Sequence, residues 1–280
     1  IFHAAREDYS NEAEKQQRRE EYVFIRATTL DNPHLPKDYI ENLRRTLSVA
    51  AWKQEVMAEI LRPEAAVYGV FERRRHSLDV GRKEDFIRSM ARDGVGYDLV
   101  YDFGPNYSHI LWIANSESGR GLVFDELCED GMSTQRIHEE IRQRCARLQR
   151  PPDWIVCDRA VMSERRWAQQ EFPMSTVQIM DSRSEQSILE GIAVVTNLLD
   201  PLVGEPKLMF ASYLWDRTPR RGIVTCMGQY RYRVEANGLL GRMPWKDNAH
   251  DHGCDDVRMW SVKRHGDSFR LLVSHRRHAA

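Results

Sequence analysis

Three short apolar runs follow one another between residues 97 and 127, and they constrain the fold more than any other feature. The runs are YDLVYDF (97–103), HILWIAN (109–115) and GLVFDEL (121–127). The segments GPNYS and SESGRG join them, and both are rich in residues that form tight turns. Because such short connections bring consecutive strands side by side, the sequence predicts a three-stranded antiparallel meander.

Helices and strands alternate after the meander. The segment MSTQRIHEEIRQRCARLQR (132–150) has helical spacing, with Ser133 or Thr134 as its N-cap, and the strand DWIVCDRA (153–160) follows it. We expect further helices at 184–199, within 215–233 and near 250–264, and a short strand at 206–212. A meander followed by βα units predicts an α/β protein with a mixed sheet and helices on its faces.

The first 95 residues have a different pattern. Residues 6–21 are polar almost throughout and predict an exposed helix or arm, and residues 22–29 form a candidate strand. Helical spacing returns between residues 38 and 61. Residues 71–96 carry many charges and few apolar side chains, which is typical of a linker. No GxxxxGK[ST] loop is present, so the chain as it stands cannot hydrolyse ATP.

Composition narrows the class of protein. The chain has 280 residues, of which 41% are hydrophobic and 30% charged, so it can bury a sizeable core. Its net charge of −1 limits any nucleic-acid surface to a local patch. The five cysteines include no CxxC pair, which indicates a reducing, intracellular setting. We expect no membrane span and no signal peptide.

Three aspartates stand out by their positions. Asp102 ends the first strand of the meander. Asp158 ends the fourth strand, at 153–160, and Asp255 lies on the expected last helix. If the first and fourth strands are neighbours, Asp102 and Asp158 face each other where α/β sheets tend to bind ligands. Carboxylate oxygens suit Mg²⁺ or Mn²⁺. Two such ions about 4 Å apart could promote phosphodiester cleavage. Capping or turn formation is the alternative role for each aspartate.

The stretch KDNAHDHGCDDVRMW (246–260) also permits a zinc site. Its candidate ligands are His250, His252 and Cys254, each two residues from the next. Residues two apart do not share a helix face, and no second ligand pair is visible elsewhere. Structural zinc is therefore disfavoured. A further alternative is a helix N-terminus at which Asp251 complements the dipole, but this leaves Asp255 unexplained.

These segments resemble a known family. ATTLDNPHLPKDYIENLRRTLSVAAWKQEVMAEIL is similar to the end of the ATPase domain of tailed-phage terminase large subunits. YDFGPNYSHILWIA and GLVFDELCEDGMS resemble the meander that opens the family's nuclease domain. IVCDRA resembles its second acidic strand, and DHGCDDVRMW its closing helix. The similarity runs in order from about residue 24 to residue 262, nearly the whole chain.

The resemblance implies an RNase H-like nuclease that cuts double-stranded viral DNA during packaging and uses two Mg²⁺ or Mn²⁺ ions. It implies that residues 1–75 are a partial ATPase domain or connector, 76–95 a linker and 96–280 the nuclease domain. The catalytic and metal-binding residues would be Asp102, Asp158 and Asp255, in the register set by His252 and Arg258. Glu126, His252 and Asp256 would lie beside them, with Asp256 as a spare ligand or a solvated acid.

Basic side chains near the acids would bind DNA phosphates. The candidates are Arg159, Arg183, Arg220, Arg221, Lys246 and Arg258, together with the run QYRYR (229–233). Each could instead be a solvated charge, and Arg258 could pair with an active-site carboxylate. The resemblance also implies portal protein and terminase small subunit as partners, no membrane, and a viral protein of the host cytoplasm.

Two other functions remain open from the sequence. A related RNase H-like enzyme, such as a resolvase or transposase core, could use the same three acids, but it would have no reason to carry the N-terminal DNPHLP…QEVMAE region. A non-catalytic module that docks on a portal or on DNA would have no metal-dependent activity.

Overall fold

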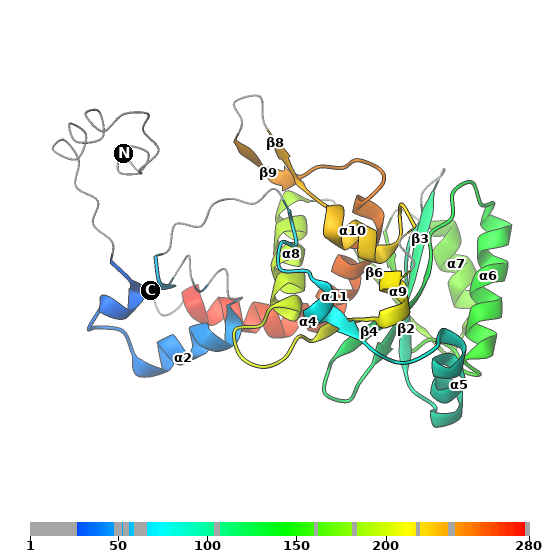
Figure 1. The fold of residues 1–280 in the computed structure, drawn as a ribbon, viewed down its shortest axis with the longest axis horizontal. Coiled ribbons are helices and arrows are strands. Elements are labelled where there is room, and N and C mark those ends of the chain that lie inside the picture. Colours follow the sequence, from blue (N-terminus) through cyan, green and yellow to red (C-terminus); the bar gives the residue numbers. More distant parts are fainter. Residues whose placement is uncertain are drawn as a thin grey trace.

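A computed structural model of the chain gives the arrangement of its elements (Figure 1). The structure describes residues 27–47, 52, 56–58, 66–103, 107–159, 162–180, 184–216, 219–234 and 239–277. The expected polar arm at 6–21 and most of the expected strand at 22–29 lie outside these residues.

A seven-stranded mixed sheet forms the centre, in the order β1-β7-β4-β3-β2-β5-β6. Its strands are β1 (Ser77–Leu78), β2 (Tyr97–Phe103), β3 (Ser108–Asn115), β4 (Gly121–Leu127), β5 (Trp154–Asp158), β6 (Thr176–Met180) and β7 (Leu208–Ala211). The pairs β2–β3 and β3–β4 are antiparallel, which confirms the predicted meander, and the other pairs are parallel. The predicted α/β fold class with a mixed sheet is therefore confirmed.

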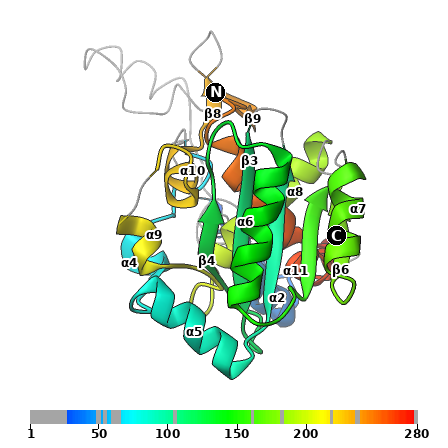
Figure 2. The same cartoon turned by 90° about the vertical axis from the view of Figure 1, so that its right-hand side faces the viewer.

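Helices cover both faces of the sheet (Figure 2). The helices α6 (Thr134–Arg147) and α7 (Met162–Glu171) lie on one face, and α8 (Glu185–Leu199) and α11 (Asp251–Arg277) on the other. Ser133 caps α6 as predicted, because its hydroxyl accepts a hydrogen bond from the backbone N–H of Arg136. Both faces of the central strands are thus covered, and Leu99, Val100 and Tyr101 are fully buried.

Helix α11 is fixed to the sheet by a buried carboxylate. Asp98 near the start of β2 is 0% exposed and accepts hydrogen bonds from Trp260 Nε1 at 2.8 Å and Arg264 Nε at 2.7 Å. Gly121 allows the close approach, since a Cβ there would lie 2.2 Å from the Trp260 ring. Asp98 is therefore a structural acid that orients α11 across the sheet.

Residues 76–95 are not a linker, so that prediction is wrong. They contain β1, which pairs with β7, and α5 (Lys83–Asp93), which buries Ile87 and Met90 in the main core. The helix ends at Gly94, whose φ of 63° lies in the left-handed region that favours glycine. A two-residue strand shows no alternation, and one apolar stripe among many charges does not reveal a packed helix.

The sequence also missed several short elements. They are η1 (Thr29–Asp31), α4 (Arg73–His76), α7, β6, α9 (Ser212–Asp216), and the hairpin β8 (Tyr232–Val234) and β9 (Leu240–Pro244). Helix α2 (Lys37–Thr46) corresponds to the first part of the helical spacing predicted between residues 38 and 61. The helix expected within 215–233 is α10 (Ile223–Gln229).

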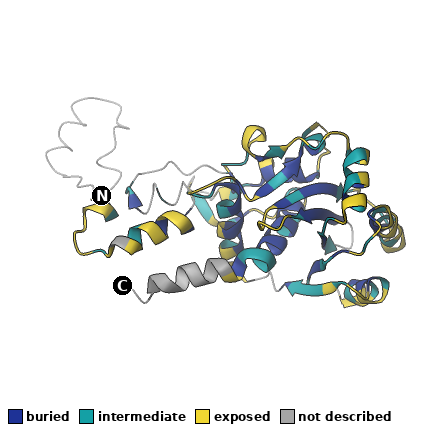
Figure 3. Cartoon of the chain, turned by 90° about the horizontal axis from the view of Figure 1, so that it is seen from below, coloured by how far each residue is buried: buried dark blue, intermediate teal, exposed yellow. Residues whose placement is uncertain are grey.

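The N-terminal part packs separately from the main core. Helix α2 is largely exposed and extends beside α11, away from the sheet (Figure 3). Its Leu43 forms a small cluster with Leu47 and Val56, against which Leu202 packs. A second apolar cluster of this kind is typical of a small satellite unit.

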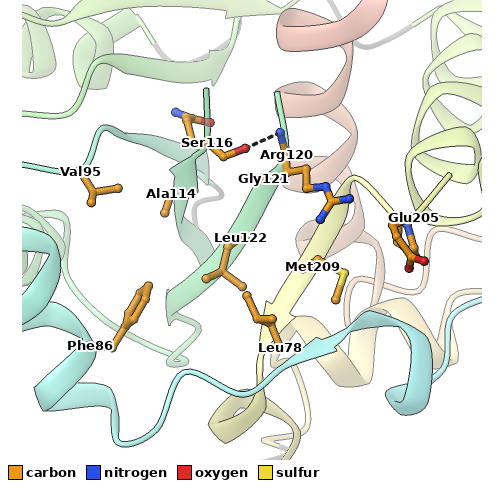
Figure 4. Close-up of a pocket in the computed structure, with 12 residues that line it drawn as sticks. Leu78, Phe86, Val95, Ala114, Ser116, Arg120, Gly121, Leu122, Glu205 and Met209 are labelled. Atoms are coloured by element: carbon orange, nitrogen blue, oxygen red, sulfur yellow. Dashed lines mark hydrogen bonds between the residues drawn. The ribbon is translucent and has the colours of Figure 1, made fainter. Parts of the chain in front are cut away.

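A cavity of about 500 Å³ opens at the end of the sheet where β3 finishes and β4 begins (Figure 4). Its walls are mainly apolar and include Phe86, Leu122 and Met209. Arg120 and Glu205 are charged residues that also line it. Asp102 and Asp158 lie at the other end of their strands, so this cavity is not the acidic site. Within the described ranges, no helix is long and apolar enough to span a membrane.

Candidate active site

Three polar side chains, those of Asp102, His109 and Glu126, form a row across one end of the sheet. Asp102 on β2 is directly opposite His109 on β3, and Glu126 on β4 is opposite Leu111. Because side chains alternate between faces along a strand, His109 and Leu111 share a face, and Asp102 and Glu126 share it with them. Tyr101 points the other way and donates a hydrogen bond to the Glu164 carbonyl of α7 at 3.2 Å. The row therefore faces α11.

Asp158 continues this row on β5. Tyr101 pairs with Cys157 in the parallel β2–β5 ladder, so Asp102 and Asp158 follow at neighbouring positions on the same face. Asp158 is the last residue of β5 and is partly buried. The condition that the sequence argument set for Asp102 and Asp158 to face each other is met, because their strands are neighbours.

The first turns of α11 cover the row. His252 Nδ1 lies 2.6 Å from Asp102 Oδ2. Burial alone would lower the pKa of His252, but the hydrogen bond and negative charge of Asp102 outweigh it and raise this pKa. Gly253 permits the close approach of the helix, because a Cβ there would lie 3.1 Å from His109 Nε2.

Asp256 also points at the row. Its Oδ2 lies 2.8 Å from His109 Nδ1, and the residue is 0% exposed. Burial raises the pKa of Asp256 well above its usual range, and the nearby charge of Asp102 raises it further. Its Oδ1 is buried without a hydrogen-bond partner in the described part of the chain. A buried carboxylate oxygen with no partner, close to a second carboxylate, fits a bound cation.

Asp255 forms ion pairs with two basic side chains, Arg258 and Lys246. Its Oδ1 accepts a hydrogen bond from Arg258 Nη2 at 2.8 Å, and its Oδ2 accepts one from Lys246. Burial alone would raise the pKa of Asp255, but Arg258 and Lys246 outweigh it and lower this pKa. The geometry therefore directs Asp256, not Asp255, towards Asp102, although the family motif registers with Asp255.

Glu126, on β4, lies at the far end of the row and contacts the first residue of α10. Its Oε2 accepts a hydrogen bond from the backbone N–H of Ile223 at 2.5 Å and lies 3.9 Å from His109 Nε2. Burial raises the pKa of Glu126. Glu126 thus joins β4 to α10 and lies next to His109, which in turn contacts Asp256.

His109 is a residue that the sequence analysis did not single out. It is fully buried, and burial lowers its pKa to about 4. Its place in the expected meander, opposite Asp102, could have identified it, because a tight hairpin fixes which residues face each other.

The basic candidates fall into different environments. Arg183 lies outside the described residues, and Arg159 and Arg220 are exposed. Arg221 is partly buried, with its guanidinium 4.3 Å from the centre of the Tyr107 ring and an ion pair to Asp130. Lys246 is 49% exposed and pairs with Asp255. Arg258 is 2% exposed, so it is not available for the DNA contact that the sequence suggested and holds Asp255 instead.

The histidines and cysteine of the 246–260 stretch do not converge. His250 Nδ1 pairs with Asp247 at 2.6 Å, His252 with Asp102, and Cys254 is buried in the core. This dispersal agrees with the argument from helical spacing against zinc. Among the described residues, no group of three or more His, Cys, Asp or Glu side chains lies close enough together to hold a metal ion.

The chain matches no model of a protein family and no curated protein. Solved structures do match. One crystal form of the large terminase from a thermophilic bacteriophage has a TM-score of 0.59 at 16% identity, covering 90% of this chain and 57% of that one. The same protein in complex with ATP-gamma-S has a TM-score of 0.58 at 15% identity, covering 90% and 58%.

The likeness includes nine-tenths of the chain, while the chain spans under two thirds of the length of the structures that it matches. The TM-scores of 0.58 and 0.59 support a shared fold, and at identities of 15–16% the likeness shows the fold alone. The chain therefore shares the fold of part of a bacteriophage large terminase.

Proposed function

We propose that the chain is a metal-dependent endonuclease that cleaves double-stranded DNA during viral genome packaging. The observation that carries the proposal is a pair of carboxylates, those of the partly buried Asp102 and the fully buried Asp256, which approach each other across the sheet–helix boundary. Two ionised carboxylates repel one another, and the burial of Asp256 adds to the cost of that arrangement unless Asp256 is protonated or a cation lies between them. The likeness to terminase large subunits supports the same conclusion.

The proposed ligands of the ions are Asp102, Asp158 and Asp256, with Mg²⁺ or Mn²⁺ as the metal. When bound, the metal pair would activate water and stabilise the departing 3′ oxygen of the DNA. The protein's part is to hold the carboxylates in place. His252 fixes Asp102 through the 2.6 Å contact, and Asp98 fixes the helix that carries Asp256.

DNA would approach over the end of the sheet where the acids lie. Arg220 and Arg221 precede α10, whose first residues contact Glu126, so both belong to the rim of the acidic row. Their charges would neutralise phosphates without reading sequence. We also propose that residues 1–75 derive from an ATPase domain or its connector, and that portal protein and terminase small subunit are partners, as in the family.

Nicking of supercoiled plasmid in Mn²⁺ tests the proposed activity. We expect the wild-type chain to convert the plasmid to open circles, and chelation of the metal to stop the reaction. The variant Asp102→Asn keeps the shape of the side chain but removes its charge, so it should fail to nick. Equal nicking by wild type and variant would contradict the proposal, and it would leave a non-catalytic docking module as the better description.

Metal binding should also stabilise the fold. A cation that binds only the folded chain adds about 2.7 kcal/mol at a concentration one hundred times its Kd. We therefore expect Mn²⁺ to raise the melting temperature of the wild-type chain in a concentration-dependent manner. The variant Asp102→Asn should show a much smaller rise, measured by differential scanning calorimetry. A rise of the same size in both proteins would indicate binding elsewhere.

A further inference from the structure

Two histidines hold the two facing carboxylates in the same manner. His252 Nδ1 lies 2.6 Å from one oxygen of Asp102, and His109 Nδ1 lies 2.8 Å from one oxygen of Asp256. Each histidine comes from the opposite layer: His252 from α11 contacts the strand acid, and His109 from β3 contacts the helix acid. The contacts therefore cross between sheet and helix in both directions.

We propose that His109 is a positioning residue, which fixes Asp256 so that its second oxygen is presented to the metal. This inference rests on the proposed function, because it takes Asp256 as a metal ligand. An ionised carboxylate only accepts hydrogen bonds, so in the metal-loaded state His109 Nδ1 donates to Asp256 Oδ2. Oδ1, which is buried and has no hydrogen-bond partner in the described part of the chain, is then the oxygen left for the ion.

The surroundings of His109 leave its ring little freedom. The side chain is 0% exposed, and Nε2 lies 3.9 Å from Glu126 Oε2. The Cβ that Gly253 lacks would approach this nitrogen to 3.1 Å, and it would approach Cys226 Sγ equally closely. The pairing of β2 with β3 places the His109 ring beside Asp102. At the same time, His109 Nδ1 contacts the carboxylate of Asp256. One rigid side chain thus fixes the spacing of the two carboxylates.

Manganese affinity, measured by titration calorimetry on the full chain, tests the inference without relying on cleavage. Side chains that orient metal ligands typically contribute 10–100-fold to affinity, so His109→Leu should weaken Mn²⁺ binding by about that factor. In His109→Asn the amide nitrogen takes roughly the place of Nδ1, so binding should stay close to wild type. In His109→Gln the nitrogen takes roughly the place of Nε2, and binding should fall as in His109→Leu.

A purely structural role for His109 predicts no difference between the asparagine and glutamine variants, and that result would overturn the inference even if the leucine variant failed to fold. Unchanged affinity in His109→Leu would also overturn it. The variant Asp256→Asn distinguishes a failure of the proposed function from a failure of the role proposed for His109. If it binds Mn²⁺ like wild type, the assignment of Asp256 in the proposed function fails. If it loses affinity while His109→Leu keeps it, only the role of His109 fails.

Discussion

Replacing Asp256 with asparagine should abolish metal-dependent cleavage while leaving the fold intact. A metal ion contributes several kcal/mol to phosphodiester cleavage, and each 1.36 kcal/mol is a factor of ten, so the rate should fall by about a thousandfold. Asparagine keeps an oxygen to accept the hydrogen bond of His109 and removes the repulsion with Asp102. The melting temperature should therefore stay the same or rise. Single-turnover nicking rates and thermal unfolding measure the two effects.

The control for this prediction is the adjacent residue. If Asp255→Asn loses cleavage at full stability while Asp256→Asn retains it, the third ligand is Asp255, as the family motif suggests. The two variants differ by one residue on the same helix turn and carry the same chemical change. Differences between them therefore report on which carboxylate faces the sheet.

Replacing Asp255 with asparagine should chiefly destabilise the protein. Arg258 is 2% exposed, and the Asp255 carboxylate lies 2.8 Å from its Nη2. Breaking a buried ion pair by removing one partner costs about 3–5 kcal/mol, because the remaining charge stays buried without compensation. We expect urea unfolding of Asp255→Asn to show a loss of this size in the free energy of unfolding.

The matched control is Asp216→Asn. Asp216 also pairs with an arginine, but the side chains of Arg73 and Asp216 are 57% and 61% exposed. Exposed pairs contribute about 0–1 kcal/mol, so this variant should unfold at nearly the wild-type urea concentration. A similar small loss for both variants would show that Arg258 does not depend on Asp255.

The local patterns of the sequence determined the central part of the fold. The runs at 97–103, 109–115 and 121–127 predicted β2, β3 and β4 almost residue by residue, because short turns and apolar runs act over a few residues. The N-cap at Ser133 was predicted for the same reason. Elements held mainly by distant partners escaped this approach. β1 has two residues and is defined by pairing with β7, more than one hundred residues away in the chain.

The residues of the candidate site also differ in how far the sequence alone could predict them. The sequence singled out Asp102 and Asp158 because both lie at the ends of expected strands, and the structure places these strands side by side. It assigned the third acid to Asp255, from the register of His252 and Arg258 with the family motif. A helix rotates by about 100° per residue, so which of Asp255 and Asp256 faces the sheet depends on how α11 is turned. That rotation is set by contacts far from the acids, chiefly those of Asp98 with Trp260 and Arg264. Only the tertiary structure supplies these contacts, and with them the facing of Asp256 to His109 and of Asp255 to Arg258.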